Sequence, residues 1–168
     1  RRNELMANLG IKCILDIDFE DIYFLSPEEF VERVLVKSLG AVKVSCGFNF
    51  KFGKNAAGDT AVLDTLCRQK GMELGVISAE SFDGKPVSST RIRKAIESGK
   101  VGTAAKMLSR YFSFDFPVAH GDRIGRTLDM PTINQIFPEG FILPKEGVYA
   151  VNVNIDGENY KGVCNIGT

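Results

Sequence analysis

The stretch F-P-V-A-H-G-D-R-I-G-R-T-L-D-M-P-T fills residues 116–132, and Asn134 follows two positions later. It begins near the point where the chain changes from alternating helices and strands to strands alone. Gly121 and Gly125 lie four positions apart in it, and glycine lets a backbone approach a ligand closely because it has no Cβ. Consecutive N–H groups in such a loop can hold phosphate oxygens. The stretch therefore predicts either a phosphate-binding loop or an ordinary glycine turn before a strand.

Polar residues of the same stretch would suit a phosphate site, although a glycine pair alone is more often an ordinary turn. Arg126 offers a forked cation that suits phosphate oxygens. Thr132 and Asn134 provide a hydroxyl and an amide oxygen, which are hard ligands of the type that Mg²⁺ accepts beside nucleotide phosphates. The candidates for such a site are Thr132 and Asn134 as Mg²⁺ ligands, and Gly121, Asp122, Gly125, Arg126 and Thr132 as nucleotide contacts.

Length and composition exclude several classes of protein. The 168 residues suffice for one ordinary domain or two small or incomplete ones. A formal net charge of zero argues against a nucleic-acid binder driven by bulk attraction to phosphate. No apolar run approaches the roughly 20 residues that span a membrane. The four cysteines are scattered, which favours free thiols in a reducing cytoplasm over a disulfide framework or a metal site.

Helix and strand patterns alternate over the first 110 residues. Helices are expected over residues 1–9, 27–39, 59–70, 90–98 and 101–109, and strands over 11–17, 41–46 and 72–78. This alternation predicts a parallel sheet covered on both faces, with ligands beyond the carboxyl ends of the strands. The loops after Cys46 and Ser78 would then border the site.

The last part of the chain shows strand patterns only. Residues 147–155 alternate at period two, Asp156-Gly157 is a hairpin signal, and residues 160–166 supply the return strand. We therefore expect an α/β chain: a partial Rossmann-like parallel-sheet module over residues 1–110, then a partial antiparallel β-barrel module over residues 111–168.

Two further motifs follow the predicted strands. In G-F-N-F-K-F-G-K (residues 47–54) the alternating phenylalanines predict core packing on one side, and Asn49 is a ligand contact or closes a turn. In V-S-S-T-R-I-R (residues 87–93) the hydroxyls precede a helix, where they could cap the helix or bind an anion. Arg91 in this motif fits a solvated role equally well.

The three motifs together resemble the bacterial bifunctional riboflavin kinase/FAD synthetase family. H-G-D-x-x-G-R-T-L-x-x-P-T-x-N is similar to its flavokinase signature, and the two upstream motifs are similar to its adenylyltransferase module. The resemblance implies transfer of phosphate from ATP to riboflavin, giving FMN, and of AMP from ATP to FMN, giving FAD and pyrophosphate. It implies that Ser89, Thr90 and Arg93 grip the ATP phosphates, that Asn49 contacts the nucleotide, and that the protein is cytoplasmic.

Several positions depart from the family pattern. Asp129 and Phe116 stand where glycine is expected, and Ile133 stands where alanine is typical, whereas Thr132 and Asn134 are kept. The family's H-x-G-H motif and the glutamate that serves as the kinase base are absent from these residues, and no methionine begins them. We therefore expect a chain truncated at both ends and poor in adenylyl transfer.

Two other functions stay open from the sequence. One is a nucleotidyltransferase of the same superfamily that acts on a non-flavin acceptor. The other is a non-catalytic barrel that binds proteins, in which Thr132 and Asn134 would have no role. The partners implied by the resemblance are ATP and flavin, with neither nucleic acid nor membrane, and a homo-oligomer is compatible with it.

Overall fold

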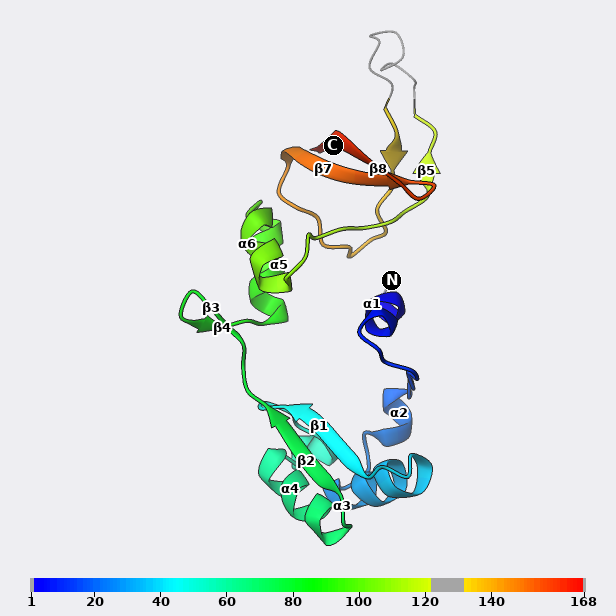
Figure 1. Cartoon of the computed structure of the whole chain (residues 1–168), viewed down its shortest axis with the longest axis vertical. Helices are drawn as coiled ribbons and strands as arrows, with labels where there is room; N and C mark the ends of the chain where they lie inside the picture. Colours follow the sequence, from blue (N-terminus) through cyan, green and yellow to red (C-terminus); the bar gives the residue numbers. More distant parts are fainter. Residues whose placement is uncertain (1, 122–131, 168) are drawn as a thin grey trace. The chain divides into compact units, whose positions relative to one another are not determined.

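The computed structural model describes residues 2–121 and 132–167 (Figure 1). The chain forms two compact units, unit 1 over residues 1–79 and unit 2 over residues 80–168. Unit 1 contains the parallel sheet, and unit 2 contains antiparallel strands and two helices. The predicted α/β fold class is thereby confirmed. The module boundary at 110/111 lies inside unit 2 and stays a prediction.

Unit 1 alternates helices with two strands. Its elements are α1 (Arg2–Asn8), α2 (Phe19–Ile22), α3 (Pro27–Phe30), η1 (Val31–Ser38), β1 (Lys43–Gly47), η2 (Lys54–Ala56), α4 (Thr60–Gln69) and β2 (Glu73–Ile77). The predicted strand over 11–17 is wrong, because these residues form no regular element and expose Leu15 and Ile17. A strand is stable where a neighbour completes its hydrogen-bond ladder. Among the described residues β1 and β2 pair only with each other, so residues 11–17 have no strand partner there.

The helix predicted from Ser26 begins as the sequence indicates. The Ser26 hydroxyl accepts from the Glu29 N–H at 3.1 Å, and the Ser26 N–H donates to the Glu29 carboxylate at 3.0 Å, which completes a capping box. After one α-helical turn the chain continues as the wider π-helix η1, in which the Leu39 N–H donates to the Val34 carbonyl. Apolar spacing does not separate these two helix types, so only the extent of the helix is predictable from it.

Strands β1 and β2 run parallel, with Val44 opposite Leu74 and Cys46 opposite Val76. Val44, Cys46 and Leu74 pack against a buried cluster formed by Val31, Phe52, Leu63, Leu66, Cys67 and Met72. The sheet residues alternate in exposure along β1, so in the described residues of unit 1 the packing covers one face of the sheet. The prediction of cover on both faces is not met here, because this two-stranded sheet carries its helices on the side of α4 and η1.

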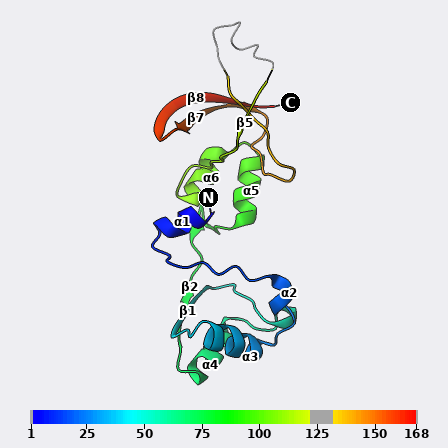
Figure 2. The same cartoon turned by 90° about the vertical axis from the view of Figure 1, so that its right-hand side faces the viewer.

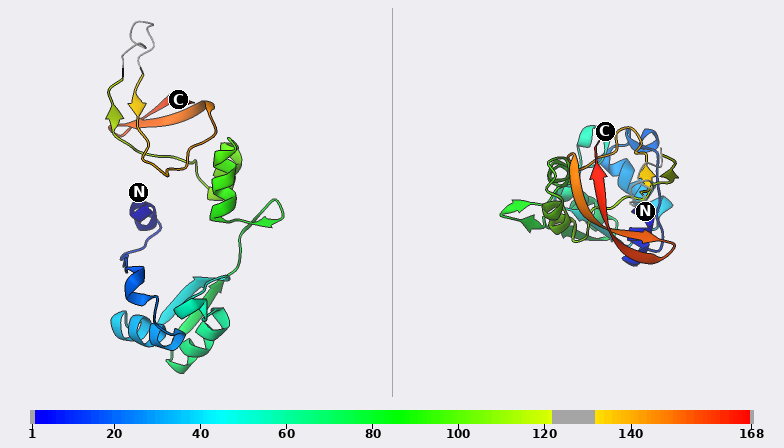
Figure 3. Two further views of the ribbon diagram at one scale, coloured as in Figure 1. Left: turned by 180° about the vertical axis from the view of Figure 1, so that it is seen from behind. Right: turned by 90° about the horizontal axis from the view of Figure 1, so that it is seen from above.

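Unit 2 begins with a short hairpin and a helix pair. Its elements are β3 (Ser81–Phe82), β4 (Lys85–Pro86), α5 (Ser89–Glu97), α6 (Val101–Leu108), β5 (Val118–Ala119), β6 (Asn134–Gln135), β7 (Gly147–Ile155) and β8 (Glu158–Ile166). Figure 3 shows the β3–β4 hairpin just before α5. The helices share a core of Ala95, Ile96, Ala104 and Met107, against which Phe112 and Ile142 also pack. The predicted helices at 90–98 and 101–109 are confirmed within one residue.

The strands β7 and β8 form a long antiparallel hairpin (Figure 2). Asp156 and Gly157 form its two-residue turn with φ of 52° and 89°, the left-handed conformation that an Asp-Gly turn adopts readily. Ile155 pairs with Glu158, so the return strand begins two residues earlier than predicted. Tyr149, Val151 and Val153 lie on the less exposed face, as the alternation predicts, whereas Ile155 is 48% exposed. No helix in the described ranges is long and apolar enough to cross a membrane.

Candidate functional site

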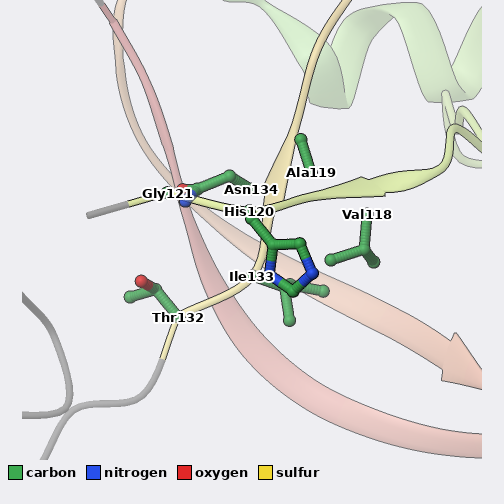
Figure 4. Close-up of a pocket in the computed structure, with 7 residues that line it drawn as sticks. All are labelled: Val118, Ala119, His120, Gly121, Thr132, Ile133 and Asn134. Atoms are coloured by element: carbon green, nitrogen blue, oxygen red, sulfur yellow. The ribbon is translucent and has the colours of Figure 1, made fainter. Parts of the chain in front are cut away.

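The antiparallel pairing of β5 with β6 brings the two ends of the glycine stretch together. Ala119 pairs with Asn134 and Val118 with Gln135, so Gly121 lies close to Asn134. A pocket of about 210 Å³ lies at this point (Figure 4), lined by Val118, Ala119, His120, Gly121, Thr132, Ile133 and Asn134. Three predicted residues, Gly121, Thr132 and Asn134, therefore line one pocket. Asp122, Gly125 and Arg126, with Asp129, lie outside the described residues.

Gly121 is required by the closeness of the Asn134 side chain. A Cβ at position 121 would collide with the Asn134 amide nitrogen. The side chains of Thr132 and Asn134 have no hydrogen-bond partner among the described residues. Those residues also contain no group of three or more His, Cys, Asp and Glu that could hold a metal ion. The Thr132 hydroxyl and the Asn134 amide offer neutral oxygens to this pocket.

His120 and Ile133 also line the pocket, and neither was assigned to it from the sequence. His120 lacks a recognisable partner in the sequence, yet it directly precedes Gly121, which is the one signal that places it beside the loop. Ile133 is 57% exposed at the pocket, so the departure from alanine adds apolar surface to the wall.

The departure at Phe116 has a structural explanation. The ring of Phe116 lies 5.0 Å from that of Phe141 and 5.6 Å from that of Phe137, both edge to face. Phe112 and Phe114 complete this group of five rings. The Phe116 carbonyl accepts from the Gln135 side chain at 2.6 Å. A glycine could not supply this ring, so Phe116 packs the base of the β5–β6 hairpin that carries the pocket.

The second candidate site is the start of α5. Ser88 is the N-cap, and its hydroxyl accepts from the Arg91 N–H at 3.3 Å. The hydroxyls of Ser89 and Thr90 are exposed and make no hydrogen bond among the described residues. Arg93 is also exposed, so these three predicted residues lie at a helix N-terminus with their polar groups available. Free N–H groups and the helix dipole make such an end a site for anions.

The Arg91 guanidinium is bonded to backbone carbonyls. Its Nη1 donates to the carbonyls of Lys85 and Pro86, both at 2.7 Å, and its Nη2 donates to the Phe82 carbonyl at 3.1 Å. These carbonyls belong to the β3–β4 hairpin, which was not predicted. Asp83-Gly84 is the signal that could have found it, because it is the same dipeptide that predicted the β7–β8 turn.

The third motif forms a folded loop in unit 1. The Phe50 and Phe52 rings stack at 5.5 Å, but Phe48 is 51% exposed, so the prediction of one shared side fails for Phe48. The alternation fails because the Phe50 N–H donates to the Gly47 carbonyl, which turns the chain at Phe48 and Asn49. Asn49 is exposed and free of side-chain hydrogen bonds among the described residues, as a ligand contact would be.

Close packing holds the rest of this loop. A Cβ at Gly58 would lie 2.5 Å from the Phe52 ring, and a Cβ at Gly53 would lie 2.8 Å from the Pro27 nitrogen. Asp59 then caps α4 by accepting from Ala61 and Val62, and it faces the Lys51 ammonium at 3.5 Å. The Val62 N–H, chiefly, lowers the pKa of Asp59 below its ordinary value.

Family models match both parts of the chain. The model described as FAD synthetase matches residues 1–91, more than half of the chain, and the model described as riboflavin kinase matches residues 108–168. The first match includes Asn49, Ser89 and Thr90, and the second includes the whole pocket. The sequence resemblance is therefore confirmed at the level of the family.

Similar proteins agree with these matches. A bifunctional riboflavin kinase/FMN adenylyltransferase of Listeria monocytogenes is 33% identical over 165 residues, covering 98% of this chain and 52% of that protein. Proteins of the same name from Pseudomonas fluorescens and Escherichia coli are 35% and 34% identical, covering 94% and 97% of this chain and 51% and 52% of theirs. The chain thus spans about half the length of these curated relatives.

A solved structure is also similar. The crystal structure described as a macrolide-efflux protein from Streptococcus pneumoniae has a TM-score of 0.86 and 27% identity, over 99% of this chain and 53% of that one. The efflux description belongs to that protein. Taken with the two family models and the site residues that they include, the matches place this chain in the FAD synthetase family.

Proposed function

We propose that this protein makes flavin nucleotides by phosphorylating riboflavin to FMN and adenylylating FMN to FAD, with ATP as the donor in both reactions. Membership of the FAD synthetase family and the riboflavin kinase match over residues 108–168 support the proposal. The relatives named above carry both activities in their names, and each is about twice the length of this chain. We place the protein in the cytoplasm, where both substrates would be available.

The kinase reaction is assigned to the β5–β6 pocket. The observation that carries this assignment is that Gly121 lines one pocket with Thr132 and Asn134, whose side chains have no hydrogen-bond partner within residues 2–121 and 132–167. Thr132 and Asn134 would hold Mg²⁺, which when bound would neutralise charge on the transferred phosphate. The glycine backbone at position 121 would admit a phosphate group that a larger side chain would exclude.

The adenylyl transfer is assigned to the start of α5. Ser89 and Thr90 would donate hydroxyl hydrogen bonds to the ATP phosphates, and Arg93 would bind their oxygens with its fork of N–H groups. The helix N-terminus adds favourable electrostatics for the same negative charge. Asn49, in unit 1, would contact the nucleotide as a separate polar group.

Incubation with riboflavin and Mg-ATP, followed by chromatography of the flavins, tests the proposal. New FMN supports the kinase assignment, and FAD that follows FMN supports the adenylyl transfer. ATP turnover without a flavin product would favour a nucleotidyltransferase with another acceptor. No new flavin, from protein whose intact mass is well above that of the 168 residues, would contradict the proposal.

A further inference from the structure

We propose that Arg91 is a positioning residue for the phosphate-binding hydroxyls: its guanidinium joins the β3–β4 hairpin to the first turn of α5 and so fixes the segment Ser88–Thr90 between them. The inference rests on the proposed adenylyl transfer. It assigns different roles to the two arginines of V-S-S-T-R-I-R, with Arg91 holding the backbone and Arg93 facing the ligand.

The contacts of Arg91 occupy three of the five N–H donors of its guanidinium. Nη1 donates to the Lys85 and Pro86 carbonyls and Nη2 donates to the Phe82 carbonyl, three bonds between 2.7 and 3.1 Å. An arginine presents five N–H donors in a rigid fork, and such charge-assisted bonds are stronger than neutral ones. Three converging carbonyls match this fork better than they match a lysine ammonium.

The β3–β4 hairpin needs an external support. Its strands contain two residues each, Ser81 and Phe82 pairing with Pro86 and Lys85, and an isolated two-stranded hairpin is marginal in water. Proline at position 86 has no N–H to give to the ladder. One further backbone bond, from the Val87 N–H to the Glu80 carbonyl at 2.8 Å, closes its base. Arg91 therefore adds three hydrogen bonds to a hairpin whose own ladder is short.

The contacts of Arg91 also explain why a cation is tolerated in the first turn of α5. A cation in the first turn of a helix opposes the helix dipole, whose positive end lies there. In α5 this electrostatic cost is offset because the Arg91 guanidinium donates hydrogen bonds to carbonyl oxygens of the preceding hairpin. Its backbone N–H meanwhile donates to the Ser88 cap. One residue thus fixes both sides of Ser89 and Thr90, whose hydroxyls make no hydrogen bond in the part of the chain that the structure describes.

The test compares Arg91→Ala, Arg91→Lys, Arg93→Ala and Lys94→Ala in the same chain. Each alanine variant removes one positive charge from α5, and Lys94 is an exposed control. Two quantities are measured: amide hydrogen exchange of residues 81–91, and binding of Mg-ATP by titration. Exchange reports whether the hairpin is held, and it requires no activity.

We expect Arg91→Ala to raise the exchange rates of the backbone amides of Val87 and of position 91 by about tenfold. It should also weaken ATP binding by about tenfold. Arg91→Lys should recover part of both effects. Arg93→Ala should weaken ATP binding with exchange unchanged, and Lys94→Ala should change neither quantity by more than about twofold. Weaker ATP binding in Arg91→Ala with unchanged exchange would make Arg91 a direct ligand and overturn the proposal. Unchanged exchange and binding would overturn it as well.

The two proposals can fail separately. A wild-type protein that binds no ATP would count against the proposed function, while the exchange of Arg91→Ala would still decide whether Arg91 holds the hairpin. A protein that makes FAD but shows normal exchange in Arg91→Ala would keep the function and lose the inference.

Discussion

The two proposed phosphate sites of unit 2 are built in opposite ways. At the start of α5 the cap Ser88, the hydroxyls of Ser89 and Thr90, and Arg93 lie within one short run of sequence. In the β5–β6 pocket, Gly121 meets Thr132 and Asn134 only because Ala119 pairs with Asn134 across the hairpin. The first site depends on the helix start and on the nearby hairpin that Arg91 contacts. The second depends on strand register, because a slip of one residue turns every side chain to the other face.

This difference decides which changes should damage each site. The α5 site should be sensitive to residues that hold the helix start, and the pocket should be sensitive to anything that separates its two strands. A substitution that disables one site should leave the other site working, because the two sites use different ligand residues.

Thr132→Val should have the largest effect. It keeps the shape of the side chain but removes the oxygen that would hold Mg²⁺, so FMN formation from riboflavin should fall roughly 100- to 1,000-fold. FAD formation from supplied FMN should stay within about twofold. Both rates are measured by flavin chromatography, and an equal loss in the two reactions would show that the sites are not independent.

Arg93→Ala should give the reverse pattern. Loss of its fork of donors should lower FAD formation from FMN about 100-fold, whereas FMN formation from riboflavin should be nearly unchanged. The same chromatographic assay reports both products. Arg93→Lys keeps the charge but loses the bidentate geometry, so its rate of FAD formation should lie between those of Arg93→Ala and the wild type. If FMN formation fell with FAD formation, the assignment of Arg93 to one site would be wrong.

Gly121→Ala should have a moderate effect that is confined to the pocket. Gly121 has no positive φ, so the backbone accepts alanine and the cost comes from the collision with the Asn134 side chain. Displacing Asn134 should lower FMN formation about tenfold. Gly102→Ala is the matched control, because a Cβ there meets nothing within 4 Å in α6. A Gly121→Ala protein as active as the control would mean that Asn134 does not need its present position.

The smallest effect concerns the caps of α4 and α5. Asp59 caps α4 with a carboxylate, whereas Ser88 caps α5 with a neutral hydroxyl. Because the Val62 N–H holds the folded pKa of Asp59 below its ordinary value of 3.8, the cap stabilises α4 above that value and is lost as pH falls through the folded pKa.

Amide exchange, corrected for its intrinsic pH dependence, should therefore rise in the first turn of α4 on acidification, with less change in α5. Asp59→Ser should remove the acid dependence of α4. Persistence of that dependence in Asp59→Ser would place its origin elsewhere.

Local signals in the sequence predicted most of the helical structure. Ser26 with Glu29, Asp59 before α4, and the glycines after α4 and α5 each mark a helix end through bonds within a few residues. The Asp156-Gly157 turn is predictable for the same reason. The strand predicted at 11–17 does not form, because a strand needs a pairing neighbour and the local pattern does not reveal whether one is present.

The candidate sites show the same difference between features that local sequence predicts and features that depend on distant pairing. The helix start at Ser88–Arg93 follows from capping rules, and the family resemblance supplied its proposed ligand. The meeting of Gly121 with Asn134 depends on strand pairing, and no local rule gives it. The role of Arg91 stayed open because its partners are carbonyls of a hairpin that was not predicted. His120 was not assigned to the site because no carboxylate or nucleophile is paired with it in the sequence, yet it lines the pocket.

The number of Mg-ATP molecules bound per chain tests the central claim most directly. Calorimetric titration would compare the wild type, Thr132→Val, Arg93→Ala and the variant with both substitutions. Two separate phosphate sites predict two ATP molecules for the wild type, one for each single variant and none for the double variant. A single ATP that either substitution abolishes, or a number that neither substitution changes, would contradict the account.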